Sequence, residues 1–244
     1  MIPATKLHNE FLRRVNRLNT SANKTFETHQ IDSYLNEGQD IFYENRLAVL
    51  ETSPQAREDL RKAEIKNACL SCKNDKNDNR VCIVKFPENY YRRARQRLTV
   101  ECKDNRNCGE KEFGIFIAQT DDINEILKDP FRKSSFEFET AWADEGSEGL
   151  YVYHDNAFIV KKVCLDYFKK LPQIAAPSLS PAGYYINDEG EKVEVDQGYI
   201  LDTTDSWRKV VDIAALIALR DTSNIQDFQT QLNKILQVEK LHIQ

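Results

Sequence analysis

The chain has 244 residues, of which 41% are apolar and 30% are charged, and its formal net charge is -5 at pH 7. This composition is that of a globular protein with one large domain or two small ones, and it excludes a disordered chain. The acidic balance argues against a dedicated nucleic-acid-binding protein, which needs a net basic face. The sequence also lacks a signal-peptide pattern and an apolar run long enough for a membrane span, so we expect assembly in the cytoplasm and no membrane contact.

Helical periodicity characterises the beginning of the chain. A first helix is expected over residues 4–18, and a second, longer helix is expected to begin at Thr28, whose hydroxyl can cap the first turn. In both segments apolar residues recur at steps of three and four, which places them on one helix face. These residues are Leu7, Phe11, Val15 and Leu18 in the first segment and Ile31, Tyr34, Leu35, Ile41, Phe42 and Val49 in the second.

Two further features of the second helix predict how it ends and packs. Ser53 and Pro54 are expected to close it and to begin another helical segment that extends to Lys66, because proline is tolerated at the first helical position. Gly38 lies in the middle of the helix, where glycine costs about 1 kcal/mol relative to alanine. We therefore expect another helix to cross closely at Gly38.

The middle of the chain reads mainly as strands. A loop is expected from Cys69 to Arg80, and β-branched runs predict strands over 80–87, 97–103 and 113–119,. A short helix that begins at Asp121 or Asp122 follows. Three more strands are then expected, the first with period-two alternation and the other two as a hairpin that turns near Asp155; they cover 136–142, 150–154 and 157–168,.

Extended chain and helices are expected at the end. Residues 171–185 contain three of the seven prolines, which predicts an extended arm,. A second hairpin with its turn at Glu189 and Gly190 follows. One helix is expected to begin at Asp205, and another at Ser223, where an S-x-x-Q capping box precedes an apolar stripe.

The fold class expected from these elements is α+β. The N- and C-terminal helices would form a helical bundle into which a mainly antiparallel β-domain is inserted, with an extended arm in addition. The expected domains are a helical bundle domain made of 1–68 and 200–244, a β-rich domain over 69–170, and the arm and hairpin over 171–199.

Cysteine spacing offers one candidate metal site. Six cysteines in a chain without an export signal are expected to be free thiols or metal ligands rather than a disulfide frame,. Cys69, Cys72, Cys102 and Cys108 could hold a structural zinc ion, since a two-residue spacing lets both thiolates of a pair face one ion. The second spacing is longer than usual and Cys82 lies between the pairs. The alternative is that the cysteines are small buried apolar side chains.

A segment of alternating aromatic and basic residues, from Tyr90 to Arg97, has two interpretations. It could follow a phosphate backbone, because aromatic rings stack on bases and arginines pair with phosphates,. The alternative is a solvated turn whose arginines pair with carboxylates of a neighbouring subunit, which the acidic balance of the chain favours.

No constellation of residues supports an enzymatic activity. The histidines His8, His29, His154 and His242 stand at no metal or triad spacing, and the carboxylates Asp144, Glu145 and Glu148 read as a wet loop,. The sequence has no phosphate-cradling glycine loop and no nucleophile elbow. We therefore expect no catalytic residues, no cofactor-binding residues and no cofactor, apart from the zinc hypothesis.

The order of the elements, together with several short stretches, resembles the head-to-tail connector (adaptor) ring proteins of tailed bacteriophages. The likeness is greatest to ring proteins of crAss-like phages. It covers most of the chain and rests on YLNEGQDIFYENR, AREDLR, FPENYYR, QTDDINEILKDPFRKSS, VCLDYFKKLPQI and WRKVVDIAALIAL.

The resemblance implies a virion structural protein that forms a ring, usually of twelve copies, in the portal–tail connector. Its implied partners are copies of itself, the portal protein, further tail or ring proteins, and genome DNA that passes through the channel during ejection without sequence-specific binding. The arm would reach a neighbouring subunit with Ile174, Leu179, Tyr184 and Tyr185. The alternative function is a zinc-stabilised nucleic-acid-binding module.

Overall fold

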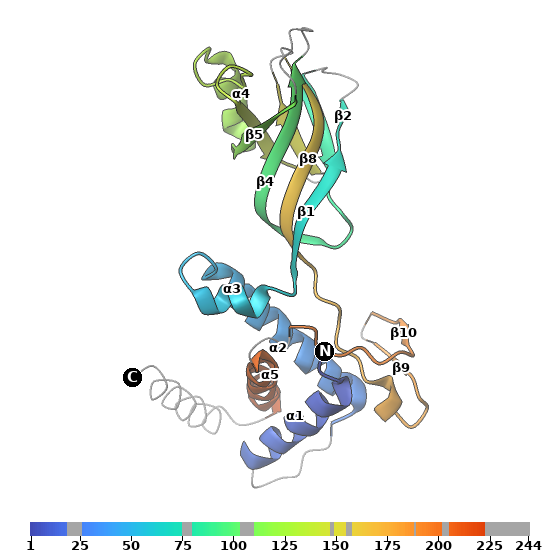
Figure 1. Ribbon diagram of the computed structural model, residues 1–244. Helices are drawn as coiled ribbons and strands as arrows, with labels where there is room; N and C mark the ends of the chain where they lie inside the picture. The colour runs from blue at the N-terminus through green and yellow to red at the C-terminus, as the bar shows by residue number, and fades with distance from the viewer. Residues whose placement is uncertain are drawn as a thin grey trace. The chain divides into compact units, whose positions relative to one another are not determined.

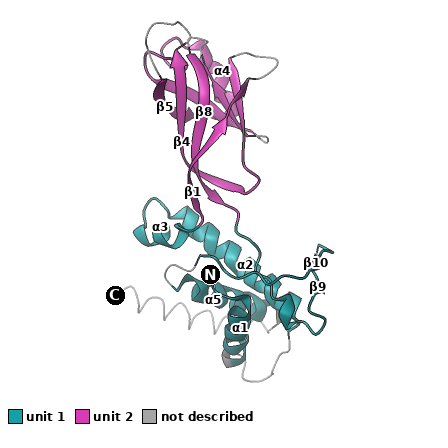
Figure 2. Ribbon diagram, turned by 45° about the vertical axis from the view of Figure 1, so that its right-hand side comes forward, with its two compact units in different colours: residues 1–62, 171–244 teal, residues 63–170 magenta. Residues whose placement is uncertain are grey.

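The computed structural model describes residues 1–18, 26–74, 80–102, 110–146, 149–154, 158–187, 189–201 and 205–222. The chain divides into two compact units (Figure 2). Unit 1 consists of residues 1–62 and 171–244, and unit 2 consists of residues 63–170. The helix expected from Ser223 lies outside the described residues.

Unit 1 contains four of the described α-helices (Figure 1). They are α1 (Ala4–Leu18), α2 (Thr28–Ala48), α3 (Pro54–Leu60) and α5 (Ser206–Thr222). The bounds of α1 and the start of α2 at Thr28 are confirmed, but the expected cap is wrong, because the N-cap of α2 is Glu27, which forms a capping box with Gln30. Ser53 is the N-cap of α3, and its hydroxyl accepts a hydrogen bond from the backbone N–H of Ala56, which satisfies one of the donors that a first turn leaves unpaired.

The close crossing expected at Gly38 is confirmed. A Cβ atom on this residue would lie 2.8 Å from the Val210 carbonyl oxygen and 3.0 Å from the Ala214 backbone nitrogen, both in α5. Since these atoms belong to the backbone of α5, they cannot rotate away as a side chain would. Gly38 therefore allows α2 and α5 to approach more closely than any other residue would permit.

The expected fold class is wrong. The chain is mixed α/β, with a curled sheet and helices that are separate elements, not a helical bundle around an inserted β-domain. The physical reason lies on the surface of α2. This helix meets α5 closely at Gly38. Other side chains of α2 form hydrogen bonds with the non-helical chain from Pro172 to Ala176 rather than with a further helix.

The expected arm is also corrected, because much of it is packed within unit 1. Ile174, Ala175 and Ala176 are buried, and a 3-10 turn, η1 (Pro177–Leu179), follows them. The expected hairpin is confirmed as β9 (Tyr185–Ile186) paired with β10 (Lys192–Val193). Gly190 in its turn has φ of 82°, a backbone conformation that glycine adopts without strain,.

Unit 2 is built on an eight-stranded sheet with the order β1-β8-β4-β5-β6-β7-β3-β2. The pairs are antiparallel except for β5 with β6, which run parallel. The strands are β1 (Glu64–Ser71), β2 (Lys73–Asn74), β3 (Val81–Lys85), β4 (Tyr90–Cys102), β5 (Glu110–Ile117), β6 (Thr140–Glu145), β7 (Gly149–Tyr153) and β8 (Phe158–Lys169).

The order of the strands requires the sheet to curl. β1 and β2 are at opposite edges, yet only Cys72 separates them in the chain. The two edges must therefore meet at Cys72. The inward face of the curled sheet holds the core of unit 2, which includes Val84, Leu98, Val100, Phe113, Leu150, Val152, Phe158, Val163 and Leu165. The helix α4 (Thr120–Lys128) buries Ile123 and Ile126.

Several strand predictions are corrected. Residues 64–71 form β1 rather than the end of a helix followed by a loop, and β4 is continuous from Tyr90 rather than beginning at 97. β7 and β8 do not form a hairpin, because β7 pairs with β3 and β6 whereas β8 pairs with β1 and β4. The pairings of β8 with β1 and β4, and of β7 with β3, join segments far apart in sequence, so local periodicity carries no signal of them.

None of the helices in the described part of the chain is long and apolar enough to cross a membrane.

Candidate functional site

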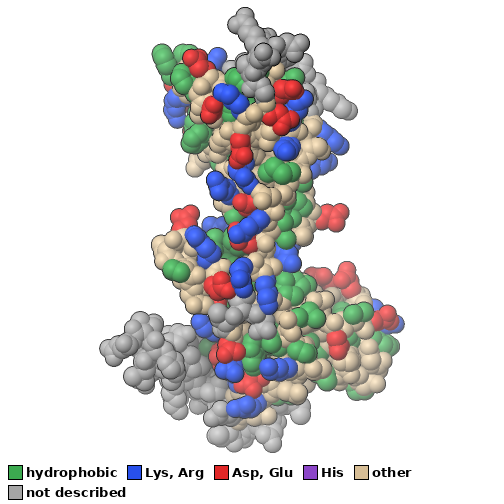
Figure 3. All heavy atoms as spheres, viewed as in Figure 1, with side chains coloured by type: hydrophobic (Ala, Val, Ile, Leu, Met, Phe, Trp, Pro, Cys, Tyr) green, Lys and Arg blue, Asp and Glu red, His purple; other side chains and the backbone are tan. Residues whose placement is uncertain are grey.

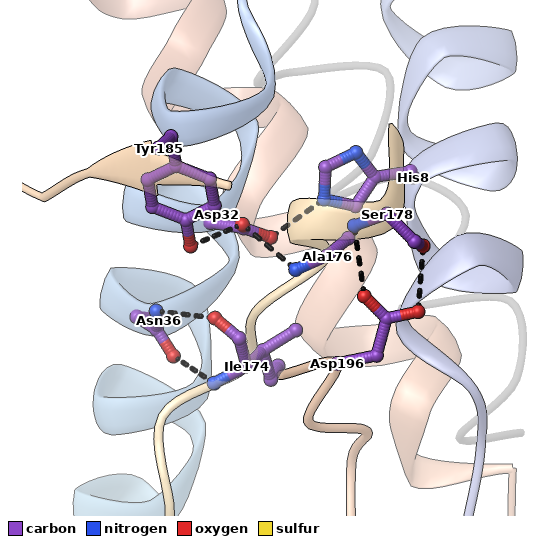
Figure 4. A network of polar contacts seen from close by, with 8 residues as sticks. All are labelled: His8, Asp32, Asn36, Ile174, Ala176, Ser178, Tyr185 and Asp196. Atoms are coloured by element: carbon purple, nitrogen blue, oxygen red, sulfur yellow. Dashed lines mark hydrogen bonds and ion pairs between the residues drawn. The ribbon is translucent and has the colours of Figure 1, made fainter. Parts of the chain in front are cut away.

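The carboxylate of Asp32 on α2 is the centre of a polar network in unit 1 (Figure 4). His8 Nε2 lies 2.6 Å from Oδ1, the Tyr185 hydroxyl donates to Oδ2 at 2.6 Å, and the Ala176 backbone N–H donates to Oδ2 at 3.0 Å. Asp32 is buried. Its two oxygens thus join α1, α2 and the chain that follows Leu171, and the arrangement is a tether rather than an exposed acid or base.

A second contact between α2 and the same stretch of chain is formed by Asn36. Its side-chain oxygen accepts from the Ile174 N–H at 2.6 Å, and its side-chain nitrogen donates to the Ile174 carbonyl oxygen at 3.0 Å. One turn further, Gln39 donates to the Pro172 carbonyl oxygen at 3.1 Å. Side chains of α2 therefore satisfy backbone groups that would otherwise be buried and unpaired.

The distal part of the segment is tied to itself. The Ser178 N–H and hydroxyl donate to the two oxygens of Asp196, at 3.0 and 2.6 Å, and Ala175 pairs with Gln197 as an antiparallel bridge. Burial raises the pKa of the Tyr185 hydroxyl, and its hydrogen bond to Asp32 raises it further. We call residues 172–197 the anchored segment.

The anchored segment has an exposed apolar side. Leu179, Tyr184, Ile186 and Val195 are exposed, to 45%, 41%, 53% and 75%. Of the four apolar residues expected to reach a neighbouring subunit, Ile174 is instead buried within unit 1, and Tyr185 is bound to Asp32. Leu179 and Tyr184 stay exposed, so the segment is fixed by polar contacts and also has exposed apolar side chains.

Sequence reasoning missed the polar residues that hold the anchored segment. Asp32, Asn36 and Gln39 follow one another at steps of four and three, so they share one face of α2,. Asp32 and Gln39 are buried on this face, whereas Ile41 and Val49 of the expected apolar stripe are exposed. The helical spacing of three hydrogen-bonding side chains beside Leu35 was the signal that could have revealed them.

The structure pairs four of the six cysteines. Cys69 of β1 forms a disulfide with Cys164 of β8, directly opposite in the register, and Cys72 forms one with Cys82 of β3. The expectation of free thiols or metal ligands is therefore corrected for these four.

The four predicted zinc ligands are not brought together by the described residues. Cys69 and Cys72 are bonded to other cysteines, and Cys108 lies outside the described residues. Cys102 is half-buried near the end of β4, where it pairs with Phe158. Cys69 is instead level with Arg97 of β4, roughly 16 Å along the strand from Cys102,. In the described ranges no three histidine, cysteine or carboxylate side chains are grouped as a metal site requires.

The arginine-rich segment is part of β4 rather than a turn. Arg93 forms an ion pair of 2.6 Å with Glu145, and Arg97 lies 3.4 Å from Glu112. Arg92 and Arg95 are exposed. Figure 3 shows basic and acidic side chains interspersed on the face in view rather than gathered by sign. The carboxylate partners of two arginines thus come from the same chain.

The remaining sequence candidates also have structural positions. His154 is buried at the end of β7, and Asp144 is buried in β6. Glu145 of β6 accepts a hydrogen bond of 2.7 Å from the Tyr90 hydroxyl. Burial raises the pKa of Tyr90, and the bond to Glu145 adds to that effect. Glu148 and His242 lie outside the described residues.

No protein-family model matches this sequence, and a search of curated proteins finds no similar sequence.

Proposed function

We propose that the chain is a structural subunit of the bacteriophage portal–tail connector, where copies form a ring around the DNA channel and dock the portal to the tail. The observation that supports this proposal is the exposed apolar side of the anchored segment. The kind of assembly is inferred from the short sequence stretches that resemble connector ring proteins. The anchored segment offers the contact surface that an assembly requires.

The anchored segment suits contact between copies for a physical reason. Its backbone is held by Asp32, Asn36 and Asp196, so little conformational entropy is lost when a partner binds it. Four of its apolar residues between 179 and 195 are exposed, and contiguous apolar patches on a surface mark interaction sites. A contact between this segment and a different surface of the next copy is heterologous, and it generates a ring when the rotation closes.

The experiment is to measure the mass of the full-length chain by mass photometry, alone and with a purified portal ring of a crAss-like phage. We expect the wild-type chain to form ring-sized assemblies with the portal. A variant carrying Ile186→Asp and Val195→Asp should lose them, because a buried charge at an apolar contact is strongly unfavourable. Both residues are exposed, so the variant should fold normally.

The matched control is Val49→Asp, which also places a charge at an exposed apolar position of unit 1 but outside the anchored segment. This control should assemble as the wild type does. If the wild-type chain stays monomeric with the portal, the connector proposal is wrong. If the double variant assembles as well as Val49→Asp, the anchored segment is not the contact surface.

The alternative, a zinc-stabilised nucleic-acid-binding module, remains a hypothesis from the sequence. The same sample distinguishes it: zinc bound in a one-to-one ratio by the purified chain and a salt-dependent DNA shift would favour the module over the ring.

A further inference from the structure

A cavity of about 410 Å³ lies within unit 2, beside α4. One face of α4 contributes Asn124, Leu127 and Lys128. Leu127 and Lys128 follow Asn124 by three and four positions, so they lie on the same side of the helix as Asn124. The turn after α4 contributes Lys133 and Ser134, and the end of β7 contributes His154. Its volume falls within the range of about 300–1,000 Å³ that is typical of small-molecule sites.

The charged residues in the described lining of this cavity are all basic. Arg80, Lys128 and Lys133 line it, and its described lining residues include no aspartate or glutamate. Within the described ranges, neither Lys128 nor Lys133 forms an ion pair with a carboxylate. Two lysines that converge on one space without counter-charges repel one another, and an anion placed between them removes that repulsion.

Hydrogen bonds fix the backbone from which these cations project. The buried Ser134 hydroxyl donates to the Tyr153 carbonyl oxygen at 2.6 Å and accepts from the Trp142 N–H at 2.9 Å. The His154 backbone N–H donates to the Arg80 carbonyl oxygen at 2.9 Å. The positions of Lys133 and Arg80 are thus set by the sheet, which gives the cavity a preorganised rim.

We propose that this cavity binds a small phosphate-bearing molecule of nucleotide size. A phosphate group carries up to two negative charges and can pair with both Lys128 and Lys133, whereas a carboxylate carries only one,. Lysine and arginine are both effective phosphate partners. Leu127 and the ring of Tyr153 supply apolar wall for the part of the ligand that carries no charge. This site is independent of the proposed ring contacts, because its described lining residues lie between 80 and 154 in unit 2, outside the anchored segment.

The test is isothermal titration calorimetry of the full-length chain with AMP, adenosine and inorganic pyrophosphate as probes. We expect AMP and pyrophosphate to bind and adenosine not to bind. The affinity for AMP should fall when the KCl concentration is raised from 50 to 300 mM, since salt screens charges at a partly open site. The variant carrying Lys128→Gln and Lys133→Gln should bind AMP about tenfold more weakly, because each exposed charge pair contributes modestly.

The matched control carries Lys85→Gln and Lys209→Gln, which removes the same charge from two exposed positions outside the cavity. It should bind AMP as the wild type does. Circular dichroism should show that both double variants are folded. The proposal is overturned if neither AMP nor pyrophosphate binds the wild type, or if the cavity variant and the control variant bind AMP equally.

Discussion

Replacing Gly38 by alanine tests whether the crossing of α2 and α5 depends on the absence of a side chain. Helix propensity alone predicts that alanine stabilises α2 by about 1 kcal/mol. The added Cβ atom, however, would lie 2.8 Å from the Val210 carbonyl oxygen, and the helices must separate by about 0.6 Å to reach the ordinary contact of 3.4 Å. Overpacking of this kind costs about 1–3 kcal/mol.

The net expectation is that Gly38→Ala lowers the free energy of unfolding of unit 1 by about 1 kcal/mol, and that Gly38→Leu lowers it further. Urea unfolding followed by tryptophan fluorescence measures this free energy when the fluorescent tryptophan lies in unit 1. The chain has two tryptophans, and Trp142→Phe leaves Trp207 of α5, which is 6% exposed, as the sole reporter.

The control for this experiment is Asn45→Ala on the exposed side of α2. It should stabilise unit 1 by a few tenths of a kcal/mol, about the propensity difference alone. If Gly38→Ala stabilises as much as Asn45→Ala or more, the helices do not depend on the close approach and the reasoning is refuted.

Two further predictions concern the tether and the disulfides. Tyr185→Phe should lower the unfolding free energy at pH 8 by about 1 kcal/mol through loss of the hydrogen bond to Asp32, and the difference from wild type in urea unfolding should narrow at pH 11. The pKa of Tyr185 is raised in the folded protein, so the contribution of its hydroxyl to the unfolding free energy is complete below the ordinary pKa of 10.0 and decreases at higher pH,. An equal difference in unfolding free energy between wild type and variant at pH 8 and pH 11 would contradict this. Cys164→Ser removes the disulfide to Cys69, which closes a loop of 95 residues. The variant should have an unfolding free energy of unit 2 that is lower by about 2–4 kcal/mol, as measured by Trp142 fluorescence. Cys102→Ser removes a free thiol and should have a much smaller effect, and equal losses in the two variants would argue against the disulfide.

What the sequence predicted well depends on local physics. The bounds of α1, the start of α2 and the cap at Ser53 follow from periodicity and capping, which involve neighbours within four residues,. The prediction at Gly38 succeeded because a glycine in the middle of a long helix is costly unless something passes close to it,.

What the sequence did not predict depends on distant partners. β1 is completed by β8, about a hundred residues later, and β7 lies beside β3 rather than β8. No local pattern distinguishes such pairings from a hairpin. The same limit applies to the candidate site, because Asp32 and Asn36 gain their roles from Ala176 and Ile174, which follow more than 130 residues later.

The first and last strands of unit 2 have a consequence for its modularity. The Lys169 N–H donates to the Ala63 carbonyl oxygen at 3.0 Å, and Glu64 pairs with Phe168, so the chain enters and leaves unit 2 at adjacent points. A compact unit whose two ends are neighbours imposes no span on the chain that precedes and follows it. Unit 2 could therefore be lengthened, exchanged or removed with a short linker from 62 to 171 in its place, while the two halves of unit 1 stay within reach of each other.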